Sequence, residues 1–548
     1  MGWLRAHAAT DNPGNDLPSV EHSETEDGTS VAIGCDNKEQ VSYMFDNLIQ
    51  LSRTASEQDF RLAILNAVIC TPHRQIAPFI PLFNLVNERD PRFFGQLAVW
   101  YYRNGGVHDL KQLFIAYLAT SKFSDEYREA GIALMQELPP YQVERVLGIV
   151  KGHTEGKAFV PGIAQSVPRC VRTGVEEYLR KRERDTEAFD NAVLHARKQL
   201  KSLYASLRIK PGDYAQKVLF DNDPPEGSRL RVLKELAAAK DPTAQARLIV
   251  ENRIPYRVAI SAIKQLTPSM IAALVSAMTP QEVINNLASL KKRGVMDNAD
   301  LRKLVEAKLE SGKTDKRVSA LKTREAVKAA GLDADMAAKV TSVGDQQIKS
   351  KARIQRPTAL HIDKSGSMTV AIDVGKQIAA IVAPICEKEL YVHAFDTMAY
   401  EITAKGAELS HWEAAFKGIN AGGGTACGAG VEMMRRKQQF VEQIIMVTDQ
   451  GENQNPRLVP SLQAYSNDMH FTPHIIIVNV GAGKDNTLER ALDQAGMSCD
   501  TFTFSGDYYS LPSLLPMIAG GDRTQLLLEI MSVPLPERKS KTLAAAAR

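Results

Sequence analysis

Oxygen-bearing side chains of the kind that bind hard cations occur at three separate points in the last third of the chain. Asp363, Ser365 and Ser367 form a D-x-S-x-S pattern, which puts one carboxylate and two hydroxyls on one loop. Thr425 ends a glycine-rich loop, and Asp449 ends a run of apolar residues. Two carboxylates and three hydroxyls, without sulfur or imidazole, suit a small hard cation. We therefore predict a divalent-metal site for Mg²⁺ first, with Mn²⁺ or Ca²⁺ next.

These donors need a fold that brings them together, because a D-x-S-x-S pattern alone is usually an ordinary turn. After residue 356, short apolar runs alternate with amphipathic segments, which predicts a doubly wound parallel sheet with helices on both faces. Asp363 and Asp449 each end a predicted strand, so they should share the edge where such sheets bind ligands. The predicted strands are 357–363, 389–395, 399–403, 443–449, 474–480 and 499–504, and the predicted helices are 371–386, 411–419, 428–440, 486–496 and 510–520.

No pattern of residues in the sequence predicts an enzyme. Ser365 and Ser367 have no histidine placed to activate them, and no G-x-x-x-x-G-K-[ST] phosphate loop occurs. The glycines at 422–424 are better interpreted as the turn that delivers Thr425. Six cysteines are scattered without a C-x-x-C pair, which suits reduced thiols in the cytoplasm. The absence of a long apolar run and of a secretory leader also favours a cytoplasmic protein without membrane contact.

Charge is distributed unevenly along the 548 residues, although the total is only +3. Residues 1–40 carry a net charge of −6, residues 41–356 carry +14, and residues 357–548 carry −5. The first 40 residues are polar and acidic, so we expect a disordered arm there. A long basic middle indicates a polyanionic partner, with solvation of helix surfaces as the alternative.

The basic middle has the apolar spacing of helices. Segments such as PRFFGQLAVWYYRN (91–104) and DLKQLFIAYLAT (109–120) place apolar residues three and four apart. The segments are short and closely spaced, which is typical of stacked helix pairs of the HEAT type, although no strict repeat period occurs. No strand is expected before residue 355. The predicted organisation is an acidic arm (1–40), a helical-repeat domain (41–355) and an α/β domain (356–548).

Two basic clusters in the helical part are candidates for binding nucleic-acid phosphates. Lys198 and Lys201 lie three residues apart, and no acidic residue occurs between His195 and Lys210. Sequence-specific recognition of RNA would need unpaired bases stacked on a group such as Tyr204. The alternative is a solvated helix surface with internal ion pairs, especially in the first cluster, where glutamates are interleaved. The candidate RNA-binding residues are Arg169, Arg172, Arg180, Arg197, Lys198, Lys201 and Arg208.

Residues 357–520 resemble a von Willebrand factor A domain. In that family a metal-ion-dependent adhesion site is formed by DxSxS, a Thr and an Asp, which match the five donors described above. The resemblance implies that the serines and the threonine coordinate the ion directly, while the aspartates act mostly through water. Gln450 departs from the pattern, because many members have glycine after the last Asp.

The helical part resembles the TROVE family, which comprises the Ro autoantigen and its bacterial relatives. The similar stretches are 89–111, 167–182 and 192–211, with a weaker match over 256–295. The resemblance implies a ring of helical repeats closed by the A domain. It also implies that small noncoding RNAs, the Y RNAs, bind the basic outer surface and that 3′ ends of misfolded RNAs enter the central hole.

Together these observations predict a non-enzymatic RNA-binding protein, a monomer within a ribonucleoprotein, with an exoribonuclease as a candidate partner. A second hypothesis is an adhesion or scaffolding protein that binds the carboxylate of a protein partner through the metal site. A third is an auxiliary subunit of a ring ATPase. RNA binding that survives EDTA would favour the first hypothesis, and protein binding abolished by EDTA would favour the second.

Overall fold

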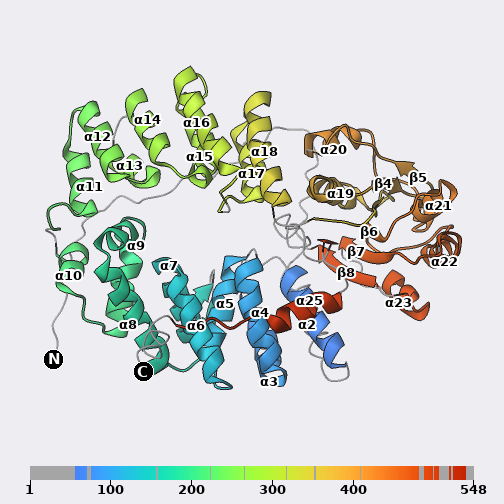
Figure 1. The fold of residues 1–548 in the computed structure, drawn as a ribbon, viewed down its shortest axis with the longest axis horizontal. Helices are drawn as coiled ribbons and strands as arrows, with labels where there is room; N and C mark the ends of the chain where they lie inside the picture. Colours follow the sequence, from blue (N-terminus) through green and yellow to red (C-terminus); the bar gives the residue numbers. More distant parts are fainter. Residues whose placement is uncertain are drawn as a thin grey trace, which may run out of the picture.

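The computed structural model describes residues 56–538, apart from 71–75, 106, 156–157, 222–223, 264–265, 316, 351–352, 408, 481–486, 498, 505–517 and 520–522. The acidic arm predicted at 1–40 lies outside these residues. A long series of helices comes first and curves into an arc (Figure 1). Its helices are α2 (Glu57–Cys70), α3 (Phe79–Arg89), α4 (Pro91–Asn104), α5 (His108–Ala119), α6 (Asp125–Glu137), α7 (Pro140–Lys151), α8 (Arg169–Arg184), α9 (Thr186–Leu207), α10 (Asp213–Leu219), α11 (Arg229–Ala238), α12 (Pro242–Asn252), α13 (Tyr256–Ala262), α14 (Pro268–Ala277), α15 (Pro280–Lys292), α16 (Ala299–Gly312), α17 (Ala320–Ala330) and α18 (Ala334–Lys349).

The sequence begins and ends these helices with ordinary capping chemistry. The Ser124 hydroxyl accepts the amide of Glu126 at the start of α6, and Thr279 forms a capping box with Glu282 at the start of α15. Helices two apart in the series contact one another, as α5 does with α7 and α14 with α16. The helices therefore stack as pairs, which is the arrangement of a helical-repeat array.

One element in the helical array was not predicted. Strands β1 (Gly152–Glu155) and β2 (Ala158–Pro161) pair antiparallel directly after α7, so the expectation of no strand before residue 355 is wrong. Gly152 has φ +104°, a backbone conformation that residues with a Cβ rarely adopt. The turn at Gly152 ends α7 and redirects the chain into the hairpin.

The second part of the chain contains a six-stranded sheet in the order β5-β4-β3-β6-β7-β8, parallel except for the edge strand β5. If the six strands are numbered from 1 to 6 along the chain, their order across the sheet is 3-2-1-4-5-6. The point at which this order reverses, the switch point, lies between β3 and β6. The predicted coarse class, a helical array followed by an α/β unit with a mainly parallel sheet, is therefore confirmed. The elements are β3 (Thr358–Asp363), α19 (Thr369–Val382), η1 (Ala383–Ile385), β4 (Leu390–Phe395), β5 (Ala399–Glu401), α20 (Leu409–Ala415), α21 (Ala429–Arg436), β6 (Gln443–Thr448), α22 (Leu458–Met469), β7 (His474–Val480), α23 (Thr487–Gln494) and β8 (Cys499–Phe504). The helix predicted at 510–520 lies almost wholly outside the described residues.

The two faces of the sheet belong to two different hydrophobic cores. On β3, Leu360 and Ile362 face a core that continues through α19 into helices α2–α10, whereas Ala359 faces a core formed with α21, α22 and α23. Successive side chains of a strand point to opposite faces, so both faces are buried and the strands are nearly continuous apolar runs. Helices α11–α18 have a separate core of their own.

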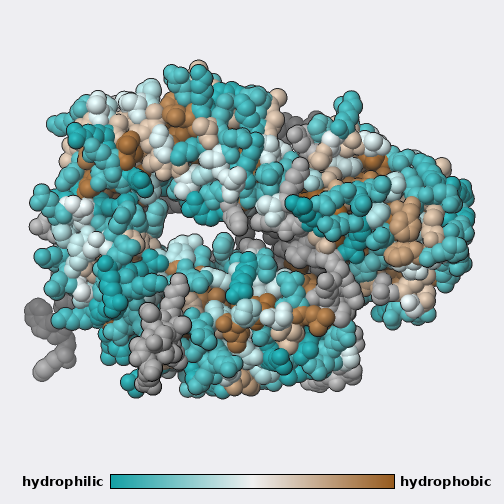
Figure 2. Space-filling model, in the orientation of Figure 1, coloured by the Kyte–Doolittle hydropathy of each residue, from teal (hydrophilic) through white to brown (hydrophobic). Residues whose placement is uncertain are grey.

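Both ends of the helical array contact the α/β unit. At one end α2 contacts β8, and at the other α18 contacts η1. The array and the α/β unit thus form a closed ring (Figure 1). Figure 2 shows an opening through the middle of the ring, bordered mainly by hydrophilic residues.

A segment that follows the sheet returns to the helical array. We call α25 (Arg523–Ser532) together with residues 533–538 the C-terminal strap. Helix α25 packs on α4 and α2, and the indole Nε1 of Trp100 donates to Glu529 at 3.0 Å. Arg538 ends the strap with two bonds to Glu129 on α6, at 2.5 and 2.8 Å, and one to Glu177 on α8, at 3.1 Å. The strap therefore links four helices of the array to the α/β unit.

No helix among the described residues is long and apolar enough to cross a membrane.

Candidate functional site

The carboxyl edge of the sheet brings Asp363 to the switch point between β3 and β6. Its carboxylate is buried, and its Oδ1 accepts the amide of Ser365 at 2.8 Å. Its Oδ2 accepts the hydroxyl of Thr448, the last residue of β6, at 2.7 Å. These bonds fix the carboxylate at the junction of the two strands, which is where ligands bind to sheets of this topology.

Two loops meet beside Asp363 and carry the predicted hydroxyl donors. Residues 364–368 bind the glycine-rich loop through its backbone: the amide of Gly366 donates to the carbonyl of Gly423 at 3.2 Å, and that of Gly422 to the carbonyl of Lys364 at 2.8 Å. Gly423 has φ +85° and a hypothetical Cβ on it would lie 3.3 Å from Asp396, so this position favours glycine. The glycine-rich loop is therefore a tight turn that leads to Thr425 beside the carboxyl edge of the sheet, which we call the rim.

Thr425 and Asp449 are held by backbone-directed bonds that leave side-chain oxygens available. The amide of Thr425 donates to Asn453 Oδ1 at 2.8 Å, and its carbonyl accepts two amides from the loop after β6. Asp449 Oδ1 accepts the amide of Gly451 at 2.9 Å. Ser365 and Thr425 are buried, Asp449 is half-buried and Ser367 is exposed, so the donor set opens to solvent on one side.

Negative charge accumulates at this rim. Burial and then the charge of Asp449 raise the pKa of Asp363, against the hydrogen bonds of Ser365 and Thr448. Burial also raises the pKa of the Cys427 thiol well above its usual range, and Asp363, Glu452 and Asp449 raise it further. A cation among these groups would relieve both the desolvation of Asp363 and its repulsion by Asp449.

A third carboxylate at the rim was missed in the sequence, although it shows the same signal as the other two. Asp396 directly follows β4 and is buried. Lys364, the second residue of D-x-S-x-S, donates to Asp396 Oδ2 at 2.5 Å and its Nζ lies 5.1 Å from the Tyr400 ring centroid. Burial opposes ionisation of Asp396, but the Lys364 ion pair and backbone amides hold the pKa of Asp396 below its usual value. Asp396 is therefore already neutralised by an internal cation.

The structure accounts for the departure at Gln450. This residue has φ +67°, in the left-handed region that favours glycine, and its side chain is buried. The Gln450 carbonyl accepts the hydroxyl of Thr487 at 2.5 Å, and Gln450 Oε1 accepts the amide of Glu489 at 3.3 Å. Compared with glycine, glutamine is less favourable in this backbone conformation, but its side chain caps the first turn of α23.

The donor set fits a hard cation in its chemistry. Asp363, Ser365, Ser367, Thr425 and Asp449 all come from the carboxyl edge of β3 and β6 or the loops beside it. No group of three or more His, Cys, Asp or Glu side chains that could hold a metal exists in the described part of the chain. A metal here would therefore depend on hydroxyls and water, which favours Mg²⁺ over a transition metal.

The seven predicted basic residues differ in their surroundings, and a first group of two is engaged within the protein. Arg180 pairs with Glu183 at 2.8 Å and donates to the Lys210 carbonyl at 2.7 Å. Arg197 donates to the Leu219 carbonyl, the last of α10, at 3.1 Å. These two arginines tie α8 and α9 to the segments that follow, because a guanidinium readily satisfies free carbonyls. They have little capacity left for phosphate.

Lys201 is half-buried, with its Nζ 5.5 Å from the centroid of the Phe220 ring. The second group consists of exposed residues with no ion pair among the described part of the chain: Arg169, Arg172, Lys198 and Arg208. The acids interleaved with them are directed elsewhere. Glu183 binds the Tyr204 hydroxyl and the Gly212 amide, Glu177 binds Arg538, and Glu187 binds Arg229. These three acids are therefore not paired with the exposed cations of the second group.

Tyr204 is not available to stack on a base. Its side chain is 1% exposed and its hydroxyl donates to Glu183 at 2.9 Å. Burial, then the bond to Glu183, raises the Tyr204 pKa far above its usual value. The structure assigns this residue to the core of α8 and α9.

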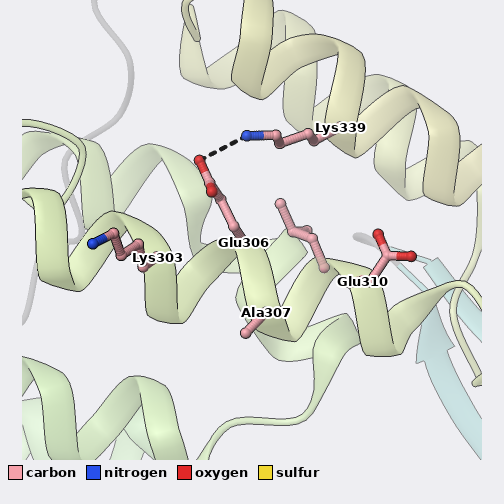
Figure 3. A pocket seen from close by; sticks show the side chains of 6 residues that line it. Lys303, Glu306, Ala307, Glu310 and Lys339 are labelled. Atoms are coloured by element: carbon pink, nitrogen blue, oxygen red, sulfur yellow. Dashed lines mark ion pairs between the residues drawn. The ribbon is translucent and has the colours of Figure 1, made fainter.

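A cleft of about 350 Å³ lies between α16 and α18, away from both sites (Figure 3). Two of its charged residues pair with each other, since Glu306 lies 2.9 Å from Lys339, and Glu306 also lies 3.2 Å from Arg302. Lys339 also lowers the Glu306 pKa. These pairs hold α16 against α18. The lining residues are Lys303, Glu306, Ala307, Leu309, Glu310 and Lys339.

The fold of the whole ring is shared with a solved structure. The crystal structure of the Ro (RSR) protein of Deinococcus radiodurans superimposes with a TM-score of 0.55 and 16% sequence identity, covering 81% of this chain and 95% of that one. The chain therefore has the fold of a bacterial Ro protein. No family model matches the sequence, and no curated protein does.

Two further structures cover about a third of the chain at lower similarity. Proximal thread matrix protein 1 from the mussel byssus gives a TM-score of 0.24 at 15% identity, covering 31% of this chain and 48% of that one. The conserved hypothetical protein BatB from Bacteroides thetaiotaomicron gives 0.23 at 14% identity, covering 32% and 98%. At these scores neither structure supports an argument about function.

Proposed function

We propose that this chain is a non-enzymatic RNA-binding protein of the Ro type. The proposal rests on the ring fold, which is shared with the Deinococcus protein over 95% of that protein and 81% of this chain. The exposed basic residues on α8 and α9 supply the electrostatic part, because their neighbouring acids are engaged elsewhere. The ligand class is a small structured noncoding RNA of the Y-RNA kind on this surface. Unpaired 3′ ends of misfolded RNA are the proposed occupants of the opening in the ring.

The chain acts as a monomer in the cytoplasm, and an exoribonuclease is its proposed partner in RNA quality control.

The first test is to purify the protein from its own cells at moderate salt and to sequence the RNA that accompanies it. A few enriched small structured RNAs would support the proposal and identify the ligand. RNA at background level would contradict it and favour the protein-scaffold alternative.

A charge-reversal variant tests the surface itself. Lys198→Glu/Lys201→Glu should weaken binding and lower the dependence of log K on log salt by about 1.4 to 1.8, since each lost phosphate contact removes roughly 0.7 to 0.9. Lys388→Glu/Lys405→Glu changes the net charge equally on exposed residues of the α/β unit and should leave the slope unchanged. Equal effects of the two pairs would place the RNA surface elsewhere.

We also propose that the rim of the α/β unit, as an A-type domain, holds Mg²⁺ on Asp363, Ser365, Ser367, Thr425 and Asp449. The accumulation of negative charge around Asp363 supports this. Isothermal titration with Mg²⁺ and Mn²⁺ should show binding that is lost in Asp363→Ala and Asp449→Asn, with RNA affinity changed by less than about twofold, because the rim lies on a separate unit from α8 and α9. Loss of RNA affinity in both variants would show that the rim shapes the ring.

A further inference from the structure

An exposed aromatic ring lies within the basic surface of α9 and α10. Phe220 follows the last residue of α10, and its side chain is 37% exposed. The amide of Phe220 is bonded to the Gln216 carbonyl, which holds the residue at the end of the helix. A helical pattern in the sequence would assign Phe220 to the core, but the chain turns away here and leaves the ring at the surface.

One cationic side chain contacts the Phe220 ring, and two more belong to the segments beside it. The Lys201 Nζ lies 5.5 Å from its centroid, near the outer limit of a cation–π contact. Arg197 binds the preceding carbonyl at 3.1 Å, and Lys217 is exposed one turn earlier on α10. The next residue, Asp221, accepts a bond from the side-chain amide of Gln216 at 3.2 Å.

The ring is also held in place from beneath. Tyr204, itself buried, meets Phe220 edge to face, with centroids 6.3 Å apart and planes at 80°. An edge-to-face contact supports a ring without covering its exposed surface. Phe220 is therefore a positioned aromatic group with adjacent cations, in the place where the sequence alone had suggested Tyr204.

Three other exposed aromatic residues of the described chain, Tyr400, Phe440 and Phe471, lack this combination. Phe440 and Phe471 contact each other, with centroids 5.5 Å apart. Tyr400 has a nearby cation, but that cation, Lys364, is paired with Asp396 at the acidic rim. The acidic surroundings of Tyr400 repel a phosphate backbone, whereas the basic surroundings of Phe220 attract one.

We infer that Phe220 is a stacking platform for an unpaired nucleobase of single-stranded RNA, with Lys198, Lys201 and Lys217 binding the flanking phosphates. The inference rests on the proposed function and deepens it by naming the chemical group that is recognised. Aromatic stacking is tolerant of sequence because every base has a π-face, so the platform would bind unpaired segments of many RNAs.

The test is fluorescence anisotropy with a labelled oligouridylate of about a dozen nucleotides, the length range that single-strand sites cover. Phe220→Ala should raise Kd about 5- to 150-fold, the effect of losing one stacked base, and leave the salt slope unchanged. Phe220→Trp should retain affinity. Phe220→Leu keeps apolar contact with Tyr204 but lacks an aromatic face, so it should resemble Phe220→Ala.

The outcomes separate this inference from the proposed function. If the wild-type protein binds neither the oligouridylate nor structured RNA, the proposed function is wrong and this inference fails with it. If the wild-type protein binds but Phe220→Ala and Phe220→Leu bind within about twofold of it, stacking is wrong while RNA binding stands. Loss in Phe220→Ala with full retention in Phe220→Leu would likewise overturn stacking, because only apolar bulk would then be needed.

Discussion

Replacing Arg538 by alanine should release the end of the C-terminal strap. The Arg538 side chain is 11% exposed and forms two bonds with Glu129, which is 21% exposed, so this pair is well shielded from water. Bonds of this charged and mostly buried kind contribute about 2 kcal/mol. The bond to Glu177, which is 39% exposed, adds only about 0.5 kcal/mol because solvent screens it.

A loss of about 2.5 kcal/mol would raise the fraction of detached strap roughly 60-fold. The assay is hydrogen exchange of peptides covering 526–538, since exchange reports local opening rather than global unfolding. Arg538→Ala should accelerate exchange in these peptides and leave α12 unaffected. The matched control is Arg257→Ala, an exposed arginine with no ion pair among the described residues.

A double-mutant cycle isolates the contact itself. If Arg538 acts through Glu129, Glu129→Gln should accelerate exchange as well, and the double variant should add little to either single one. Additive effects, or exchange in Arg538→Ala equal to that in Arg257→Ala, would refute the view that this ion pair fastens the strap.

Two further predictions concern the α/β unit. Burial lowers the pKa of His393 to about 4, so the unfolded chain binds a proton near pH 6.5 while the folded one does not. The free energy of unfolding should therefore fall as the pH is lowered from 6.5 to 4, by roughly 3 kcal/mol in total. His393→Leu should weaken this dependence, which is measured by urea unfolding with hydrogen exchange in β4 as the readout. An unchanged pH dependence in the variant would contradict the assignment. Gln450→Ala keeps the left-handed backbone but loses the bond to the Glu489 amide, so it should destabilise α23 by about 1 kcal/mol. Gln450→Gly loses the same bond but relieves roughly 1 kcal/mol of backbone strain, so thermal unfolding should place it above Gln450→Ala. The reverse order would contradict the strain at this position, and a Gln450→Ala variant as stable as the wild type would show that the cap is unimportant.

The sheet was predictable because parallel strands covered on both faces are continuous apolar runs. The run at 474–480 matches β7 residue for residue, and Asp363 ends β3 as expected. The hairpin at Gly152 could not be predicted in the same way, because GHTE and AFVP have no alternation and depend on a glycine conformation. Residues 533–538 also have no periodicity, so nothing in the sequence indicated a strap.

The candidate RNA-binding residues show a different limit of prediction from sequence. Arg180, Arg197 and Lys198 are equivalent in a count of charges, yet only Lys198 remains exposed and unpaired in the described structure. The partners that engage the arginines are carbonyls 22 and 30 residues away, which are set by tertiary packing. The same applies to Tyr204, which is buried in the core and whose hydroxyl donates to Glu183, 21 residues earlier. Spacing along a helix predicts a shared face, but it does not predict which members of that face are already bonded.

The strap also affects the order of events during protein synthesis. Trp100 and Glu529 are separated by 429 positions, and Glu129 and Arg538 by 409. At about 5 to 20 residues per second, a ribosome needs roughly 20 to 80 seconds to connect these partners. During that interval α4 and α6 are complete while the segment that will cover them has not been made. Contacts so distant in sequence form late, so the ring stays unfastened while most of its helices already exist. An RNA strand that reached the nascent helices in this period would lie inside the finished ring without an end having been threaded through it.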